Sequence, residues 1–300
     1  MEFYKSINKR LKVYYRRHYA FIYLFWRMQQ GPIGVFDSGY GGLTVLKEIR
    51  RQLPQYDFIY LGDNARTPYG NRSFETVYHY TWQCVQWFFK QACPLVILAC
   101  NTASAKALRS IQQNELAKNY PDKRVLGVIR PTTEIIGNES KTNHVGILAT
   151  NGTVQSQSYL IEIEKFFPQA KVVQQACPML VPLIENNEFE NEAADYFIQK
   201  YLKELLNKDE RIDTILLACT HYPLIKNRIE KFLPPEIYVI AQGEIVAASL
   251  KDYLNRHPEI EKQLTKNNSV QFYTTDSTED FNNHASIFYG QEVESKHVEL

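Results

Sequence analysis

Residues 96–102 read Val-Ile-Leu-Ala-Cys-Asn-Thr, and residues 215–221 read Ile-Leu-Leu-Ala-Cys-Thr-His. Each stretch is a short apolar run, typical of a buried strand, that ends in a cysteine and polar residues. The two cysteines, Cys100 and Cys219, lie 119 residues apart. Chance similarity between buried strands is the simpler explanation, but an Ala-Cys pair followed by small polar residues is not generic. The two stretches therefore indicate an internal duplication.

Two further pairs of segments recur in the same order along the chain. Gly34–Gly39 aligns with Gly146–Gly152, about 112 residues later. Gly127–Pro131 aligns with Tyr238–Gln242, about 111 residues later. Three strand-and-loop units repeated in one order predict two similarly folded halves.

Apolar, β-branched runs alternate with longer amphipathic segments, which is typical of an α/β fold with a parallel sheet. Leu43, Leu46, Ile49 and Leu53 form one helical stripe. A helix that starts at Glu244 is expected to return to the first half. The expected strands are Ile33–Phe36, Phe58–Leu61, Val96–Ala99, Val125–Ile129, Val145–Leu148, Val172–Gln175, Thr214–Ala218 and Tyr238–Ala241, with Val270–Tyr273 as a candidate last strand.

These patterns predict a fold class of α/β type with two pseudo-symmetric, flavodoxin-like parallel-sheet domains. The first domain is expected to combine residues 31–127 with 245–300, and the second to span 128–244. Ligands bind beyond the carboxyl ends of parallel strands, so two facing halves enclose a site in the cleft between them.

The charge of the chain is unevenly distributed. The 300 residues carry a net charge of +1, of which residues 1–27 contribute +6, so the remainder carries −5. A mildly acidic body argues against nucleic-acid binding as the main function. Residues 1–30 are interpreted as a basic, aromatic extension that is dispensable for the fold and too short in apolar length to span a membrane. The five cysteines are an odd number and are too sparse for a disulfide framework in a chain of this length. This favours a cytoplasmic protein with reduced thiols.

Chemistry is expected where the two central strands end. Cys100 precedes a helix over residues 102–108, and a helix N-terminus favours a thiolate over a thiol. Cys219 takes the equivalent place, with His221 two residues on. Two activated thiols therefore face one cleft. The alternatives are that both are small buried hydrophobes, or that Cys219, His221 and Cys100, with or without Asp37, bind zinc.

Polar residues at the other strand ends complete the expected rim. Asp37 and Ser38 begin a glycine-rich loop that suits an anionic ligand. The alternative interpretation of Asp37 is a helix cap. Thr150 and Thr153 belong to a hydroxyl-rich loop in the second half that suits an anion. Glu185 follows an apolar stretch, and a solvated surface carboxylate is its simplest interpretation.

With these motifs assembled, the sequence resembles the glutamate racemases of the aspartate/glutamate racemase superfamily. The matching motifs are Phe36–Thr44, Gly62–Asn64, Pro68–Gly70, Ala99–Ser104, Gly146–Thr153, Cys177–Pro178, Val181–Glu185 and Leu217–Leu224. The resemblance implies a cofactor-independent, two-base racemase without a metal. In such an enzyme one thiolate takes the α-proton of an amino acid and a second thiol delivers a proton to the opposite face.

The resemblance also implies a role for each residue. Cys100 and Cys219 exchange the acid and base roles, Asp37 assists on the Cys100 side, and His221 and Glu185 assist on the Cys219 side. The expected substrate-binding residues are Asp37, Ser38, Tyr69, Gly70, Asn101, Thr102, Thr150, Thr153, Thr220 and His221. Many members carry an Asp-Ser pair where this chain has Ala241-Gln242.

The implied function is the interconversion of L- and D-glutamate, which supplies D-glutamate for peptidoglycan. The implied partners are this small-molecule substrate and a second copy in a homodimer, with no membrane. DNA gyrase binding is known for some glutamate racemases. The alternatives are a racemase of aspartate or another amino acid on the same scaffold, and a metal-binding or non-catalytic protein that uses Cys100, Cys219 and His221.

Overall fold

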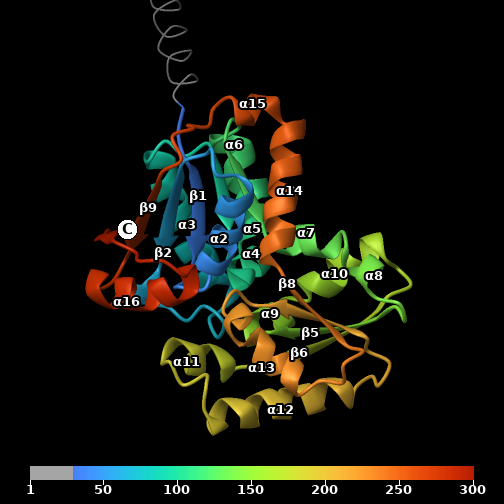
Figure 1. The fold of residues 1–300 in the computed structure, drawn as a ribbon. Helices are drawn as coiled ribbons and strands as arrows, with labels where there is room; N and C mark the ends of the chain where they lie inside the picture. Colours follow the sequence, from blue (N-terminus) through green and yellow to red (C-terminus); the bar gives the residue numbers. More distant parts are fainter. Residues whose placement is uncertain (1–29) are drawn as a thin grey trace, which may run out of the picture.

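The computed structural model describes residues 30–300, so the predicted N-terminal extension lies outside the described residues except for Gln30. The chain forms two sheets, one in the upper and one in the lower part of Figure 1, and every strand pairing is parallel. The six-stranded sheet contains β1 (Ile33–Asp37), β2 (Phe58–Gly62), β3 (Leu95–Leu98), β4 (Arg124–Gly127), β9 (Val270–Thr274) and β10 (Ser295–His297). The four-stranded sheet contains β5 (His144–Ala149), β6 (Lys171–Ala176), β7 (Thr214–Ala218) and β8 (Tyr238–Ala241).

Both sheets repeat one strand order. The first runs β10-β9-β2-β1-β3-β4 and the second runs β6-β5-β7-β8, so β2-β1-β3-β4 and β6-β5-β7-β8 correspond. Phe36 pairs with Leu98 in the first sheet, and Leu148 pairs with Leu217 in the second. This register makes Gly34 equivalent to Gly146. The predicted duplication and the predicted fold class are therefore confirmed.

The third predicted alignment is wrong by three residues. Leu98 pairs with Gly127, and its equivalent Leu217 pairs with Ala241. Gly127 therefore corresponds to Ala241 and not to Tyr238. A short run of buried aliphatic residues matches another run at several offsets, and only the hydrogen-bonded register decides between them.

The expected strands are present, with several ends shifted by one residue, one larger difference in extent and one additional strand. Val128 and Ile129 leave the strand that they were expected to share with Val125, because Val128 adopts helical backbone angles and precedes a helix. Strand β10 was not expected: it has only three residues, Ser-Lys-His, and lacks the apolar alternation that reveals a strand.

The helices cover the faces of both sheets. Around the first sheet lie α2 (Leu43–Gln52), α3 (Phe74–Lys90), α4 (Asn101–Lys106), α5 (Leu108–Ser110), α6 (Ala117–Asn119), α14 (Gly243–Arg256), α15 (Pro258–Glu261) and α16 (Thr278–Tyr289). Around the second lie α7 (Ile129–Thr133), α8 (Ile136–Glu139), α9 (Asn151–Ser156), α10 (Ser158–Phe166), α11 (Leu180–Glu185), α12 (Glu192–Leu206) and α13 (Lys226–Lys231). Single turns η1 (Asn64–Arg66) and η3 (Tyr222–Ile225) are 3₁₀-helical, and η2 (Ile111–Leu116) is a π-helical turn.

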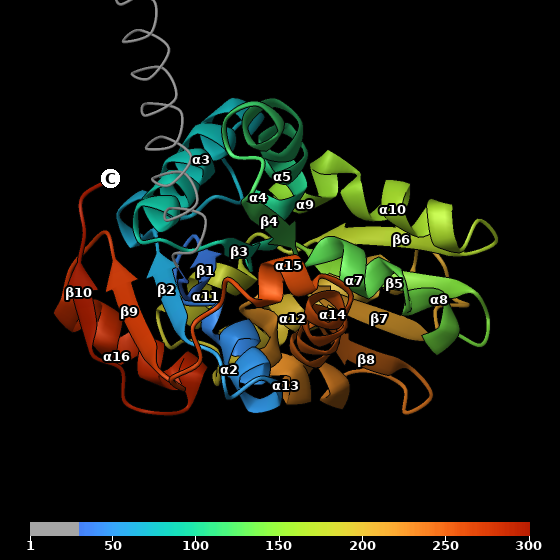
Figure 2. The ribbon, with the colours of Figure 1, turned by 90° about the horizontal axis from the view of Figure 1, so that it is seen from above.

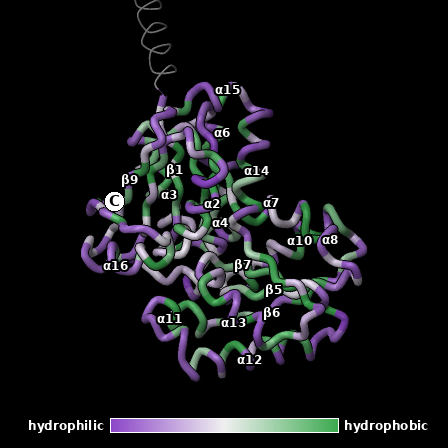
Figure 3. Tube along the Cα trace, in the orientation of Figure 1, coloured by the Kyte–Doolittle hydropathy of each residue, from purple (hydrophilic) through white to green (hydrophobic). Residues whose placement is uncertain are grey.

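One hydrophobic cluster runs through both halves. The predicted stripe of Leu43, Leu46 and Ile49 on α2 is buried, and α2 packs on α14, the helix that returns from the second sheet. Ile215 and Leu217 of β7, in the second sheet, belong to the same cluster. Hydrophobic segments follow the strands in Figure 3, while α15 and α16 are mostly hydrophilic. Figure 2 shows α2 beside α14 from above. The two halves are therefore packed together rather than joined by a linker alone.

Asp57 connects the start of β2 to the loop before β9. Its carboxylate accepts hydrogen bonds from the backbone and side chains of Asn267 and Ser269 at 2.7–3.1 Å. Burial raises the pKa of Asp57, but the hydrogen bonds outweigh burial and lower that pKa to about 2. The ionised carboxylate therefore stabilises the fold.

We expect Asp57→Asn to lower the free energy of unfolding by about 2 kcal/mol at pH 7. A lowered folded-state pKa gives stability that is present above the unfolded value near 4 and is lost as the pH falls through about 2. Urea unfolding at pH 7 and pH 3 tests this: the difference between variant and wild type should shrink at pH 3. Asp252→Asn, at an exposed surface pair, is the control and should change stability little. A pH-independent difference for Asp57→Asn would contradict the prediction.

Candidate active site

The carboxyl ends of the strands carry the predicted site residues. Asp37 ends β1, Cys100 follows β3, Thr150 follows β5 and Cys219 follows β7. A hydrogen bond joins the strand ends of the two halves: Thr220 donates from Oγ1 to Asp37 Oδ2 at 3.2 Å. The carboxyl ends of the strands in the two sheets therefore meet at the predicted residues.

Cys100 is the N-cap residue of α4. Its sulfur accepts the backbone N–H of Ala103 at 3.4 Å, and its thiol donates to Ser38 Oγ at 3.6 Å. Burial and the nearby charge of Asp37 nevertheless raise the pKa of Cys100 to about 12, against the opposing hydrogen bonds with Ala103 and Ser38. The helix amide favours a thiolate, as expected, but desolvation of the buried sulfur outweighs it and the pKa is raised on balance.

Cys219 has a different neighbour. Its sulfur lies 3.8 Å from His221 Nδ1, and His221 Nε2 lies 2.9 Å from Glu185 Oε1. The chain after Cys219 forms the short 3₁₀ turn η3. An α-helix begins directly after Cys100, but not directly after Cys219. Pro223 lies within this turn, where its missing N–H suits a first helical turn.

His221 links the sulfur to the carboxylate. Burial lowers the pKa of His221, but its contacts with Cys219 and Glu185 outweigh burial and raise that pKa well above its usual value. These contacts favour the protonated imidazole. Glu185 is not a solvated surface carboxylate: its side chain is 18% exposed and holds the far nitrogen of His221.

Asp37 connects the two cysteine environments. Its Oδ1 accepts the N–H of Gly39 at 3.0 Å, and its Oδ2 accepts the hydroxyl of Thr220. Burial raises the pKa of this fully buried carboxyl, although the charge of His221 opposes the rise. Ser38, and not Asp37, is the residue in hydrogen-bond contact with Cys100.

Gly41 is required where the loop after β1 meets the second half. A Cβ atom on Gly41 would lie 2.4 Å from His221 Nδ1 and 2.3 Å from Thr220 Oγ1. Thr44, at the start of α2, donates from Oγ1 to Thr220 O at 2.9 Å. The backbone of the first half therefore approaches the Cys219 side closely, and any side chain at Gly41 would separate them.

Three threonines, one from the first half and two from the second, form a cluster of hydroxyl groups. Thr102 Oγ1 lies 2.9 Å from Thr150 Oγ1 and 3.5 Å from Thr153 Oγ1. Beside them the N–H of Gly152 donates to Gly70 O at 2.7 Å, which joins the first-half loop to the second half. The predicted residues Thr102, Thr150 and Thr153 are thus brought together.

The side chains of Tyr69 and Asn101 form hydrogen bonds to other residues of the protein. The ring of Tyr69 is 1% exposed and its hydroxyl donates to Asp63, which Arg66 also binds. Asn101 bonds through both ends of its amide to Gln242 and Tyr159. These side chains hold the rim in shape.

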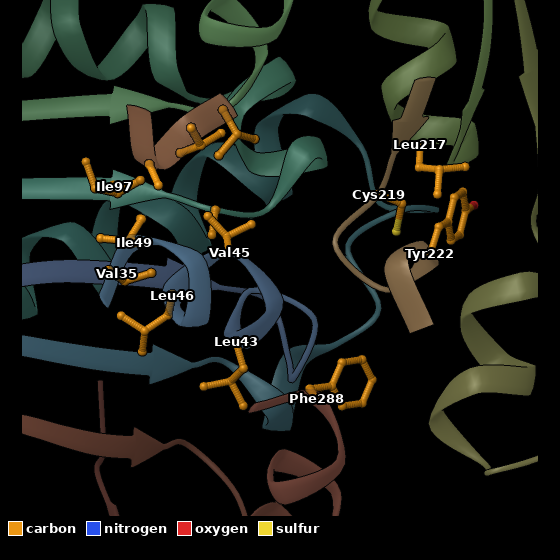
Figure 4. Close-up of a cluster of buried hydrophobic side chains, with 14 of the residues drawn as sticks. Val35, Leu43, Val45, Leu46, Ile49, Ile97, Leu217, Cys219, Tyr222 and Phe288 are labelled. Carbon is orange, nitrogen blue, oxygen red and sulfur yellow. The ribbon is translucent and has the colours of Figure 1, made fainter. Parts of the chain in front are cut away.

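Sequence reasoning missed two neighbours of the site. Phe288 of α16 packs its ring edge-on against His221, with ring centroids 5.2 Å apart, and Figure 4 shows it in the same cluster as Cys219 and Tyr222. Tyr60 donates from its hydroxyl to Gly39 O at 2.8 Å. Phe288 lies outside every motif of the sequence, so no local signal reveals it. Tyr60 was detectable only as a polar atom within a buried strand.

A metal site is not favoured by this geometry. Both ring nitrogens of His221 already face Cys219 and Glu185. Within residues 30–300, no three His, Cys, Asp or Glu side chains are arranged to hold a metal ion.

Comparison with known proteins gives one consistent answer. Residues 33–250 match the family model described as Asp/Glu/Hydantoin racemase. The chain is 38% identical over 264 residues to glutamate racemase of Aquifex aeolicus, a match that covers 88% of this chain and 96% of that relative. A glutamate racemase isoform of Bacillus anthracis superposes with a TM-score of 0.82 at 33% identity, covering 90% and 98% of the two chains. Glutamate racemase of Francisella tularensis in complex with D-glutamate superposes with a TM-score of 0.79 at 34% identity and the same coverage.

We expect Glu185→Gln to lower the pKa of His221, because the variant removes the negative charge that stabilises the imidazolium. Titration of ¹⁵N-labelled histidine side chains by NMR measures this, and His221 of the wild type should remain protonated at pH 7. Glu188→Gln, on the neighbouring loop, is the matched control and should leave the titration unchanged. An unaltered His221 titration in Glu185→Gln would show that another group holds the proton.

Proposed function

Because the chain belongs to the Asp/Glu/hydantoin racemase family, we propose that Cys100 and Cys219 are the two acid–base groups that racemise its amino-acid substrate. The chain is an isomerase whose function is racemisation of glutamate, the activity that its relatives share. In this family the D-glutamate formed serves peptidoglycan synthesis. The observation that carries the assignment is the pair of buried cysteines at equivalent strand ends of two duplicated sheets.

The reaction moves one proton off and another onto the α-carbon. A thiolate takes the α-proton of glutamate from one face and becomes a thiol, which leaves a planar carbanion. The second thiol then gives its proton to the opposite face and becomes a thiolate. Each turnover exchanges the protonation states of the two sulfurs, so the duplicated fold matches the near mirror symmetry of the chemistry.

The surroundings of the two sulfurs set their starting roles. Burial holds Cys100 as a thiol, so Cys100 is the proton donor at the outset. Cys219 lies beside His221 Nδ1, and Glu185 holds the other nitrogen of that ring, so Cys219 is the base at the outset. The reverse reaction begins from the opposite protonation states.

The substrate is expected to contact both halves. Thr150 and Thr153, with Thr102, offer hydroxyl donors for a carboxylate, while buried Asp37 suits the substrate ammonium. Ser38, Tyr69-Gly70, Asn101 and Thr220 line the same strand ends and complete the proposed binding set. A small site that excludes water strengthens each of these polar contacts.

The remaining proposals concern partners and compartment. Among residues 30–300 no helix is both long and apolar enough to cross a membrane. The five cysteines are all unpaired, which fits a reducing compartment such as the cytoplasm. A homodimer is proposed from the resemblance alone, and light scattering tests it.

We expect the circular dichroism of L-glutamate to decay to zero when it is incubated with the purified protein without added cofactor. Cys100→Ala and Cys219→Ala should each lower the rate by about 10²- to 10⁴-fold, because each removes one acid–base group. Cys93→Ala removes a buried thiol outside the site and is the control, with an expected rate close to wild type. Wild-type decay that survives loss of either cysteine would overturn the two-base assignment.

The alternatives are separated by two further measurements. An aspartate racemase on this scaffold would turn over aspartate faster than glutamate, and the cleft must sense the one-methylene difference between them. A metal-dependent protein would lose activity in a chelator, whereas a thiol racemase keeps it. We expect glutamate to be preferred and the chelator to have no effect.

A further inference from the structure

Gln242 stands where the chain returns from the second sheet to the first. Strand β8 ends at Ala241 and α14 begins at Gly243, so Gln242 is the one residue between them. The chain passes from the first sheet to the second between β4 and α7, a segment called the outward crossing here. Val128 lies in this segment and is the structural counterpart of Gln242. Gln242 Nε2 lies 3.2 Å from Val128 O, so one side chain touches both crossings.

The amide of Gln242 also closes a ring of three hydrogen bonds. Asn101 Nδ2 donates to Gln242 Oε1 at 2.7 Å, Gln242 Nε2 donates to the Tyr159 oxygen at 2.7 Å, and the Tyr159 hydroxyl donates to Asn101 Oδ1 at 2.5 Å. Each group gives one hydrogen and accepts one. Reversing the Gln242 amide would place its oxygen beside the carbonyl oxygen of Val128, so this contact fixes the orientation of the amide.

A second arm leads from Gln242 to the outward crossing. Its Nε2 donates the other hydrogen to Thr132 Oγ1 at 2.9 Å, and Thr132 Oγ1 donates to Val128 O at 3.1 Å. Gln242, Asn101 and Tyr159 are all buried, with Gln242 at 4% exposure. Loss of any one partner therefore leaves a buried polar atom unsatisfied.

Asn101 is the point at which this network meets the reaction. It is the first residue of α4 and directly follows Cys100, the N-cap of that helix. Asn101 comes from the first half, and Tyr159 from the second. The ring thus holds the start of α4 in register with the second half, which carries Cys219.

From this geometry, and resting on the proposed function, we infer that Gln242 is a positioning residue for racemisation. It fixes the Asn101 amide and, through it, the place of Cys100 relative to Cys219 and the bound amino acid. A displacement of about 1 Å between reacting groups costs up to roughly a hundredfold in rate. Release of Asn101 should therefore lower kcat and raise KM.

The test compares three variants of the full chain. Gln242→Met keeps the length of the side chain but removes its hydrogen bonds. Tyr159→Phe frees Asn101 Oδ1, while Asn101 Nδ2 stays bonded to Gln242 and Gln242 stays bonded to Thr132. Thr132→Val, the matched control, removes the two hydrogen bonds of Thr132 to Gln242 and Val128 and leaves the ring around Asn101 complete. For each, kcat and KM are measured with L- and D-glutamate, and the melting temperature is measured by calorimetry.

We expect Gln242→Met and Tyr159→Phe to lower kcat/KM by about tenfold to a hundredfold. The loss must be equal for the two enantiomers, because their free energies are equal. Thr132→Val should lower the melting temperature and leave kcat and KM unchanged.

Three results would overturn the inference. Wild-type kcat and KM in Tyr159→Phe would do so, even if Gln242→Met fails to fold. Equal loss of activity in Thr132→Val would show that the crossing, and not Asn101, is what matters. A lower melting temperature with unchanged kinetics in Gln242→Met and Tyr159→Phe would show a structural role only. A wild-type protein inactive on both enantiomers would instead refute the proposed function itself.

Discussion

The facing carboxyl edges of the two parallel sheets are the constraint on which the site depends. Strand ends in a parallel sheet lie along one edge, so a duplicated sheet supplies two such edges. The shared hydrophobic cluster packs them together, and the contact between Thr220 and Asp37 joins them at the site. Two cysteines far apart in sequence are thus brought to the same site.

The duplication is symmetric in backbone and asymmetric in chemistry. Cys100 is surrounded by a helix amide, a serine hydroxyl and a nearby carboxylate. Cys219 instead lies beside an imidazole held by Glu185. In the proposed reaction one sulfur must be an acid while the other is a base, and unequal surroundings bias which of the two holds the proton. The asymmetry supplies that difference.

Much of the fold was predictable because it depends on patterns within short windows. The strands from Ile33 to Ala241 and the α2 stripe follow from apolar periodicity, and the two Ala-Cys strand ends reveal the duplication. The third repeat was aligned three residues out of register, since buried aliphatic runs match at several offsets. The placement of Asp37, Cys100 and Cys219 was predictable for the same reason as the strands: each lies at a strand end.

The amino-acid sequence by itself determined the two-sheet class, the residues at the strand ends and the pair of candidate thiols, because these features are local. Only the tertiary structure decided how the residues act on one another. It placed Glu185 on His221, left the thiol of Cys100 with a raised pKa, and joined Gln242 to Asn101. Burial and hydrogen bonding between distant segments set these properties, and neither is written in the spacing of residues along a chain.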